Sequence, residues 1–368
     1  MMKIGFDAKR AYNNSSGLGN YSRFLIQALH TSFPENEFEH YTPKINSKYA
    51  QFYADSIQEP YGIHQYWRSF WRSYFIKSQL QKEKVDVYHG LSNELPFGIE
   101  KATFKKVVTI HDLIFLRYPN FYKKVDRMIY EKKFLHAAKT ADEVIAVSNQ
   151  TKTDLVSMMD IPEQKIEVIG QDCDEQFHRT VSSSEVSRVK EKYHLPSNYI
   201  LSVGTIEERK NQLKVVQAFC KIKSDYQLIL VGRKTAYQNI IEQYLKEKRF
   251  EHKVKILNNA SFKDFPAMYT GATIAVYCSL FEGFGIPILE AFNIGTPVIT
   301  STGGCFEEVA GDAAMKVNAT KIEEIQEAMS DLLENEAERA KLELLGKEQA
   351  LKFRGDKIAK KVMEVYKR

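Results

Sequence analysis

The chain has 368 residues, which is long for a single hydrophobic core and suits two domains. Hydrophobic residues make up 43% and charged residues 27%, as in a globular protein, and the net charge of +5 argues against a nucleic-acid-binding protein. No apolar run reaches the roughly 18 residues of a membrane span, and Asp7 interrupts what would be the apolar part of a signal peptide, so we expect a cytoplasmic protein.

Short β-rich runs alternate with longer helical stretches along the whole chain. Near-continuous Val, Ile and Leu runs suit parallel strands that crossover helices cover on both faces. The fold class that follows is α/β, with two doubly wound, Rossmann-like domains. The predicted strands are 3–8, 38–43, 85–90, 107–112, 143–148 and 165–170 in the first half, and 199–205, 226–232, 253–257, 273–279, 296–301 and 313–318 in the second.

The composition becomes polar between residues 172 and 198, and we place the linker there. The expected domains are therefore 1–177 and 178–355. The last helix, near 356–368, is amphipathic, and we expect it to pack back on the first domain.

Basic and aromatic residues concentrate in two segments of the first half. Residues 101–133 hold nine Lys or Arg against three acids, and residues 61–84 hold five Lys or Arg, one acid and seven aromatics. For the aromatics of 64–80 we favour core packing. The alternative is a basic, aromatic-rich face beside an acceptor cleft, suited to an anionic lipid surface or a lipid-pyrophosphate acceptor.

In the second half, FEGFGIPILEAF follows a predicted strand directly. Gly283 and Gly285 allow a tight turn, and Pro287 suits the first position of a helix. The backbone amides from Phe284 to Ile288 would then form an anion site at the carboxyl end of the strand. Glu282 and Glu290 would bind neutral hydroxyl groups there; the alternative is a surface acid and an acid stabilised by the helix dipole.

VGTIEERKN, residues 203–211, follows the first strand of the second half. We expect Arg209 and Lys210 to open the next helix. Cations at that end oppose the helix dipole, so the pattern favours an anionic partner such as a diphosphate. Together the two stretches indicate a nucleotide-sugar site.

EGFGIPILE resembles the E-x₇-E signature of retaining glycosyltransferases of family 4, which have the GT-B fold of two Rossmann-like domains facing a cleft. The resemblance continues, in chain order, through nearly the whole sequence: FDAKRAYNNSSGLGNYSRFL, HGLSNELP, TIHDLIFLRYP, VIAVSNQTKTDL, VGTIEERKN and GTPVITSTGGCFEEVAGDAA. Each fragment is short, and the ordered set carries the assignment.

The resemblance implies a role for each matching residue. Glu290 binds the donor ribose, Glu282 contacts the transferred sugar, and His111 points at that sugar near its anomeric carbon. The family often has an arginine directly after the strand's glycine, where this chain has Thr205, so the division of diphosphate contacts among Thr205, Arg209 and Lys210 stays open. The remaining donor-binding residues are Gly17 and Gly19 in a first-domain loop and the amides of Phe284, Gly285 and Ile286.

The activity implied is retaining transfer of a hexose from a nucleoside-diphosphate sugar to a glycan or lipid-linked glycan in cell-surface polysaccharide synthesis. GDP-mannose is the first donor to test. We expect no cofactor and no metal ion, and a peripheral contact with an anionic membrane at its inner face. The alternatives are a nucleotide-sugar 2-epimerase or a phosphorylase on the same fold, and a basic nucleic-acid-binding protein.

Three weaker patterns remain in the sequence. Asp172-Cys173-Asp174 spells a D-x-D metal signature, which we interpret as a turn at the domain junction. His89 ends a predicted strand and is a second candidate beside His111. The four scattered cysteines lack a C-x-x-C pair and indicate buried thiols in a reducing compartment.

Overall fold

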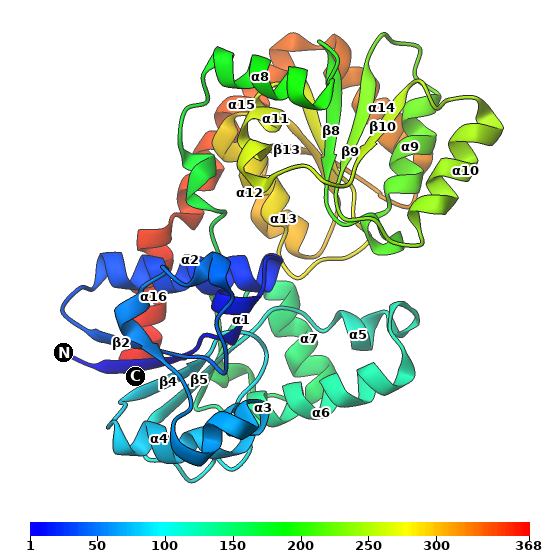
Figure 1. The fold of residues 1–368 in the computed structure, drawn as a ribbon. Helices are drawn as coiled ribbons and strands as arrows, with labels where there is room; N and C mark the ends of the chain where they lie inside the picture. Colours follow the sequence, from blue (N-terminus) through cyan, green and yellow to red (C-terminus); the bar gives the residue numbers. More distant parts are fainter. The chain divides into compact units, whose positions relative to one another are not determined.

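The computed structural model describes residues 1–368, except for the side chains of Ile63 and Ser69. The chain divides into two compact units: the N-terminal unit holds 1–172 and 353–368, and the C-terminal unit holds 173–352 (Figure 1). Sequence placed these borders a few residues later, at 177/178 and 355/356. The earlier first border has a packing reason, because Phe177 is fully buried and its ring packs on Phe262 and Tyr269 of the C-terminal unit.

The N-terminal unit is built on a seven-stranded parallel sheet of order β3-β2-β1-β4-β5-β6-β7. Six of its strands were predicted; β3, only two residues long, was not. The strands are β1 Lys3–Asp7, β2 Glu37–Tyr41, β3 Ile57–Gln58, β4 Val87–Gly90, β5 Lys105–Ile110, β6 Glu143–Ala146 and β7 Ile166–Val168. The helices are α1 Lys9–Asn13, α2 Gly17–Ser32, α3 Arg68–Phe70, α4 Ile76–Lys82, α5 Ile114–Arg117, α6 Lys124–Thr140, α7 Asn149–Met159 and α16 Gly355–Lys367.

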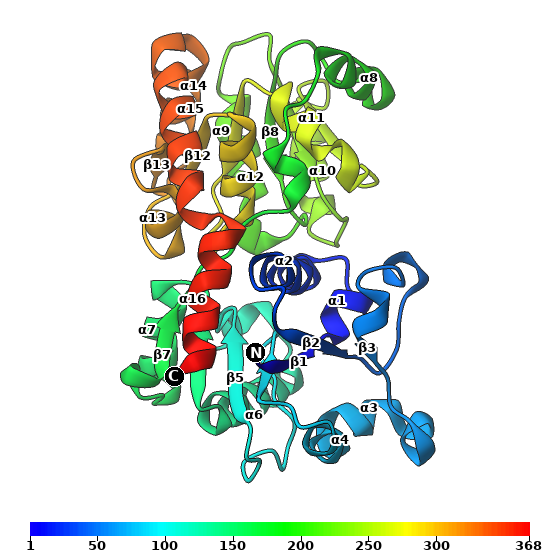
Figure 2. The ribbon, with the colours of Figure 1, turned by 90° about the vertical axis from the view of Figure 1, so that its left-hand side faces the viewer.

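The C-terminal helix α16 belongs to the N-terminal unit and packs against α2 (Figure 2). Its buried residues recur at helical spacing, among them Ile358, Val362 and Tyr366. The Tyr366 hydroxyl hydrogen-bonds His89 Nδ1 on β4, at 2.6 Å. His89 is therefore part of a buried structural network, and its second nitrogen lies 2.9 Å from Thr109 Oγ1.

The C-terminal unit has a six-stranded parallel sheet of order β10-β9-β8-β11-β12-β13. All six strands fall where the sequence predicted them. They are β8 Tyr199–Val203, β9 Gln227–Val231, β10 Val254–Leu257, β11 Ile274–Tyr277, β12 Val298–Ser301 and β13 Ala314–Val317. The helices are α8 Ser183–Tyr193, α9 Gln212–Cys220, α10 Gln238–Lys248, α11 Phe265–Thr270, α12 Ile286–Ile294, α13 Cys305–Ala310, α14 Ile322–Glu334 and α15 Glu336–Ala350.

The predicted linker at 172–198 is wrong for most of its length, because it contains α8. The Ser182 hydroxyl accepts a hydrogen bond from the Glu185 amide at 3.2 Å and caps the helix. The stretch SSSE is thus a Ser-x-x-Glu helix start, and its polarity reflects capping.

Core packing is also wrong for most aromatics of 64–80. Only Trp71 is fully buried, at 1% exposure, whereas Trp67 is 61%, Phe70 is 54% and Tyr74 is 51% exposed. They lie on a string of short helical turns, Gly62–Trp67, α3 and Trp71–Phe75, which is too irregular to turn one apolar side inward.

Candidate functional site

The candidate site of the C-terminal unit lies where its chain changes direction across the sheet. Strands β8 and β11 are neighbours; β9 and β10 extend the sheet on one side, and β12 and β13 extend it on the other. In open parallel sheets, ligands bind beyond the carboxyl ends of the strands at this switch point. The loop after β8 carries Arg209 and Lys210, and the loop after β11 carries Glu282, so both predicted stretches meet there.

The two cations pair with one buried carboxylate. Arg209 Nη1 lies 2.6 Å from Glu282 Oε2, and Lys210 Nζ lies 2.7 Å from Glu282 Oε1. Arg209 also pairs with Glu207 at 2.6 Å, and Lys210 donates a hydrogen bond to the Tyr277 hydroxyl at 2.9 Å. The Lys210–Glu282 contact is an ion pair rather than a well-aligned hydrogen bond, since Glu282 Oε1 has no aligned donor. The cluster therefore satisfies its own charges.

Burial alone would raise the pKa of Glu282, but Lys210 and Arg209 lower it to about 2. Glu282 is therefore an anion at neutral pH and a weak base. If Glu282 is to contact a sugar, as expected, its carboxylate must first break its ion pair with Arg209 or with Lys210. The sequence did not indicate these ion pairs.

Arg209 and Lys210 do not open a helix, contrary to the sequence prediction. They belong to a 3₁₀ turn, Glu208–Lys210, and Asn211 in the left-handed conformation (φ 59°) separates this turn from α9. The Asn211 side chain donates to Cys278 O at 3.0 Å and to Ala319 O at 2.7 Å. The loop is thereby tied to the end of β11, which places both cations beside Glu282.

The helix start predicted after Gly283 is α12. Gly285 precedes it with φ 119°, a conformation that favours glycine, and no side chain caps the helix. Pro287 is its second residue, one position later than the sequence predicted. Phe284 is 3% exposed and fixes the approach of the chain. The amide groups of Gly285 and Ile286 thus lie at an uncapped helix start.

Glu290 lies one turn into α12 and is 6% exposed. Its Oε2 accepts a hydrogen bond from the Tyr269 hydroxyl at 3.0 Å. Burial raises the pKa of Glu290 to about 7, and the Tyr269 hydrogen bond opposes that rise. Glu290 therefore already accepts a hydrogen bond from one neutral hydroxyl group.

Two known protein families together match most of the chain. Residues 17–171 match Glycosyltransferase Family 4, and residues 183–349 match Glycosyl transferases group 1. The chain belongs to the group 1 glycosyltransferases. O-antigen chain mannosyltransferase B of Escherichia coli is 27% identical over 392 aligned positions that cover all of both chains. O-antigen chain mannosyltransferase RfbU of Salmonella typhimurium is 29% identical over 62% of this chain and 60% of its own length.

Solved structures of the same architecture include HepE of Anabaena in complex with UDP and glucose. It has a TM-score of 0.78 and 16% identity over the whole of both chains. A sucrose-phosphate synthase from Thermosynechococcus elongatus has a TM-score of 0.77 and 20% identity, covering 100% of this chain and 98% of its own. These likenesses confirm the GT-B fold for this glycosyltransferase.

In the N-terminal unit of this glycosyltransferase, His111 follows β5 directly and is 7% exposed. Its Nε2 lies 3.0 Å from the Leu91 carbonyl oxygen, which can only accept, so Nε2 carries the proton and Nδ1 keeps a lone pair. Burial lowers the pKa of His111 to about 4, with the positive charge of Arg10 adding to the effect. His111 is thus a neutral hydrogen-bond acceptor at physiological pH.

Residues that the sequence did not single out hold His111 in place. Asn93 accepts from the His111 amide at 2.7 Å. The Tyr21 ring meets the His111 ring edge-on, with 4.5 Å between centroids, and the Tyr21 hydroxyl lies 3.0 Å from Thr109 Oγ1. Asn93 has a positive φ of 64°. The Asn in HGLSN, three residues after the end of β4, is the one sequence signal that could have identified it.

Gly17 and Gly19 lie in the first turn of α2 and not in a loop. A Cβ atom on Gly19 would lie 1.9 Å from Asn14 O, whereas one on Gly17 would have nothing within 4 Å. Gly19 therefore has a packing role, and only Gly17 has open space beside it. Thr205 stays in the loop after β8, and its carbonyl accepts from the Gln212 side chain at 2.9 Å.

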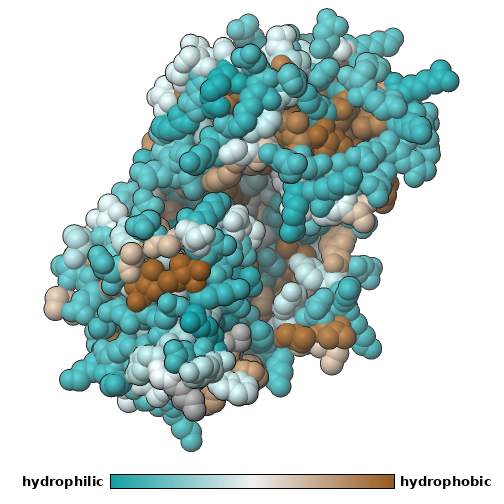
Figure 3. All heavy atoms as spheres, in the orientation of Figure 1, coloured by the Kyte–Doolittle hydropathy of each residue, from teal (hydrophilic) through white to brown (hydrophobic). Residues whose placement is uncertain are grey.

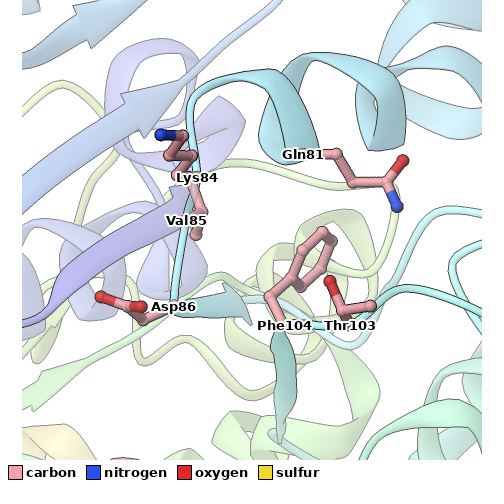
Figure 4. A pocket seen from close by; sticks show the side chains of 6 residues that line it. All are labelled: Gln81, Lys84, Val85, Asp86, Thr103 and Phe104. Atoms are coloured by element: carbon pink, nitrogen blue, oxygen red, sulfur yellow. The ribbon is translucent and has the colours of Figure 1, made fainter.

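One pocket of the N-terminal unit lies away from His111. It has a volume of about 360 Å³ and is lined by Gln81, Lys84, Val85, Asp86, Thr103 and Phe104 (Figure 4). Asp86 and Phe104 directly precede β4 and β5, so the pocket lies at the amino ends of the strands, the edge opposite His111.

Asp174 of the D-x-D pattern accepts from the Gln176 amide at 3.1 Å and caps a short turn. All four cysteines are buried, as expected, and none of them forms a disulfide. Among the described residues, no helix has the length and apolarity needed to cross a bilayer.

Proposed function

We propose that the protein transfers a hexose, with retention at the anomeric carbon, from a nucleoside-diphosphate sugar to a hydroxyl of a glycan or lipid-linked glycan. Mannose from GDP-mannose is the first donor to test, because relatives covering all or much of this chain are named mannosyltransferases of O-antigen chains. Synthesis of a cell-surface polysaccharide is the corresponding process. The observation that carries the proposal is the Arg209–Lys210–Glu282 cluster beside the uncapped start of α12.

In this proposal the donor diphosphate takes the place of Glu282 against Arg209 and Lys210. The amides of Phe284, Gly285 and Ile286 orient its oxygens, Gly17 lets the start of α2 approach them, and Glu290 accepts from the ribose hydroxyls. Once displaced, Glu282 is free to contact the transferred sugar. His111 offers its Nδ1 lone pair to a sugar hydroxyl near the anomeric carbon.

Catalysis would then rest on charge stabilisation of the leaving diphosphate and on fixed orientation. Glu282 is a poor base, and the leaving phosphate itself would deprotonate the acceptor hydroxyl on the same face as departure. We propose that Arg209, Lys210 and the helix amides do the work of a metal ion, so EDTA should leave turnover unchanged; a loss restored by a divalent cation would refute metal independence.

We also propose that the N-terminal unit meets an anionic membrane at its inner face. The first half of α6 exposes an apolar stripe at helical spacing: Val125 is 66%, Met128 62% and Ile129 46% exposed. In Figure 3, hydrophobic atoms gather where Figure 1 draws α5 and α6. Lys124, Arg127 and Lys132 lie on the same helix, and basic residues near an anionic surface each contribute about 1 kcal/mol.

The direct test of donor choice is thermal stabilisation by GDP, UDP, dTDP and ADP. A ligand at a hundred times its dissociation constant adds about 2.7 kcal/mol to the stability. We expect GDP to give the largest shift, and transfer of label from GDP-mannose to an extract of lipid-linked saccharides. No shift with any of the four nucleotides would refute the donor site.

Lys210→Ala should lower turnover at least about tenfold, because one of two buried cations facing the leaving group is lost. Lys263→Ala, an exposed lysine of the same unit, is the control and should leave turnover unchanged. Wild-type turnover in Lys210→Ala with a normal melting temperature would reject the assignment. Incubation of the donor alone separates the alternative, since a 2-epimerase changes the sugar without an acceptor.

A further inference from the structure

The N-terminal unit has its own topological switch point, between β1 and β4. Strands β2 and β3 extend its sheet on one side, and β5, β6 and β7 extend it on the other. The same rule that locates the donor site therefore singles out the carboxyl ends of β1 and β4 as a second ligand position. Asp7 ends β1, Lys9 and Arg10 begin α1 directly after it, and Glu94 follows β4.

The acids at this edge are already neutralised by other cations. Asp7 accepts from Arg72 Nε at 2.9 Å through each of its two oxygens. Glu94 Oε2 accepts from Arg72 Nη1 at 2.8 Å, and Glu94 Oε1 accepts from Lys133 Nζ at 3.2 Å. Arg72 is 8% exposed, so this cluster is a closed, largely buried network.

The side chains of Lys9 and Arg10 do not take part in this network. Both are half-buried, and among the described side chains neither cationic group has an ion pair or a side-chain hydrogen bond. Burial lowers the pKa of Lys9, and the charges of Arg72 and Arg10 lower it further, against the opposing effect of Glu94 and Asp7. A partly desolvated cation that repels its neighbour is unfavourable in the free protein, and an incoming anion would relieve it.

An aromatic column starts at the same cluster. Phe97 lines a small pocket of about 20 Å³ together with Asp7, Arg72, Glu94 and Lys133. From Phe97 the rings continue outward, to Tyr74 at 5.5 Å, Phe70 at a further 6.2 Å and Trp67 at a further 6.0 Å between centroids. The three outer rings are about half exposed or more, which is unusual for a protein surface without a partner.

We propose that Lys9 and Arg10 form an anion subsite that holds the diphosphate of a lipid-linked acceptor, with the first isoprenoid units of its lipid on the Phe97–Tyr74–Phe70–Trp67 column. This rests on the proposed glycosyl transfer and narrows its acceptor from a glycan to a phosphorylated amphiphile. Two unpaired cations match a diphosphate in charge, and apolar rings match the chain that follows it. Lys9 and Arg10 follow β1 and His111 follows β5, so the proposed subsite and His111 lie at the same carboxyl edge of the N-terminal sheet.

Binding of farnesyl diphosphate and of farnesol in detergent micelles tests the subsite without knowledge of the acceptor sugar. We expect the wild type to prefer the diphosphate, and Lys9→Ala/Arg10→Ala to weaken farnesyl diphosphate at least about tenfold without affecting farnesol. Lys360→Ala/Lys361→Ala removes the same two charges from the exposed face of α16 and should change binding less than about twofold. Trp67→Ala/Phe70→Ala should weaken farnesyl diphosphate but leave binding of inorganic diphosphate unchanged.

GDP binding in the same variants separates the possible sources of the anion. If the subsite serves the acceptor, Lys9→Ala/Arg10→Ala binds GDP as the wild type does. An equal loss of GDP affinity would mean that the cations hold the donor diphosphate and would overturn the acceptor assignment. Unchanged farnesyl diphosphate affinity in a protein that still binds GDP would refute the subsite alone, whereas a wild type that binds no nucleotide would refute the proposed function.

Discussion

In the proposed function Glu282 occupies the place of the donor diphosphate, since it neutralises both Arg209 and Lys210 at under 3 Å. An opposite charge about 4 Å away is worth roughly 4 kcal/mol near a protein surface, before desolvation, and these contacts are shorter. In the free protein the carboxylate therefore lowers the cost of burying two cations. In the proposed function it also competes with the donor.

Glu282→Gln should consequently separate binding from turnover. With the competing charge removed, we expect the dissociation constant of GDP to fall at least about threefold, while turnover falls at least about tenfold because the sugar contact is lost. Calorimetry with GDP and initial rates with the full donor measure the two effects. Glu323→Gln, on an exposed helix of the same unit, is the matched control. Weaker GDP binding in Glu282→Gln would contradict the competition.

Glu290 predicts a pH dependence of donor binding. Its pKa of about 7 in the folded protein lies above its ordinary 4.5, so the folded state binds the extra proton between these values, and stability from this group is lost as pH rises through that window. Ribose hydroxyls donate to the ionised form. GDP affinity should therefore rise about tenfold between about pH 6 and about pH 8. Glu290→Gln should abolish this slope; a slope that persists would assign it to another group.

At the scale of elements, the two glycines of α2 have different functions. Gly19→Ala places a methyl group 1.9 Å from Asn14 O, a backbone atom that cannot rotate away. We expect a loss of about 1–3 kcal/mol in the free energy of unfolding. Gly17→Ala meets no atom and should keep the wild-type melting temperature, since alanine also favours helix.

Thermal unfolding of the two variants measures the difference in their stability. Kinetics with varied donor concentration then test the proposed role of Gly17. If α2 approaches the donor phosphates at Gly17, Gly17→Ala should raise the Michaelis constant for the donor despite its normal stability. Equal melting temperatures for both variants would refute the packing role of Gly19.

Arg209 and Lys210 are placed by a loop and not by a helix. Their sequence spacing fitted a helix start, but the left-handed Asn211 ends the turn and its amide group joins β11 to the loop. The two cations reach Glu282 because of this loop geometry. Helix periodicity carries no information about such a turn.

On the whole-molecule scale, α16 returns the chain to the N-terminal unit and fixes the middle of its sheet. Tyr366→Phe removes the hydroxyl that meets His89 Nδ1 in a fully buried position. Leaving a buried nitrogen unsatisfied should cost about 1–3 kcal/mol. Thermal or urea unfolding should show the loss, whereas Tyr74→Phe, on an exposed ring, should be neutral. An unchanged stability would mean that His89 finds another partner.

Most of the architecture was predictable because most strands are rich in Val, Ile and Leu, as suits a parallel sheet that is covered on both faces. The sequence predictions failed where polar residues cap a helix or where a strand is very short. The SSSE stretch was interpreted as linker but caps α8, and the two-residue β3 has too little sequence to be recognised. The aromatics of 64–80 were assigned to a core because composition does not say which rings the fold leaves exposed.

The sequence by itself determined the order of strands and helices, the two-domain organisation and the stretches from which the candidate site is built, since hydrophobic periodicity and turn residues act locally. Only the tertiary structure decided which charges meet. Glu282 pairs with cations more than 70 residues away, His111 has its proton placed by Leu91 O, and Lys9 and Arg10 stay unpaired because Arg72 and Lys133 reach the neighbouring acids first. These outcomes depend on distances between distant segments, and electrostatic energy depends on that distance and on burial, neither of which a linear pattern contains.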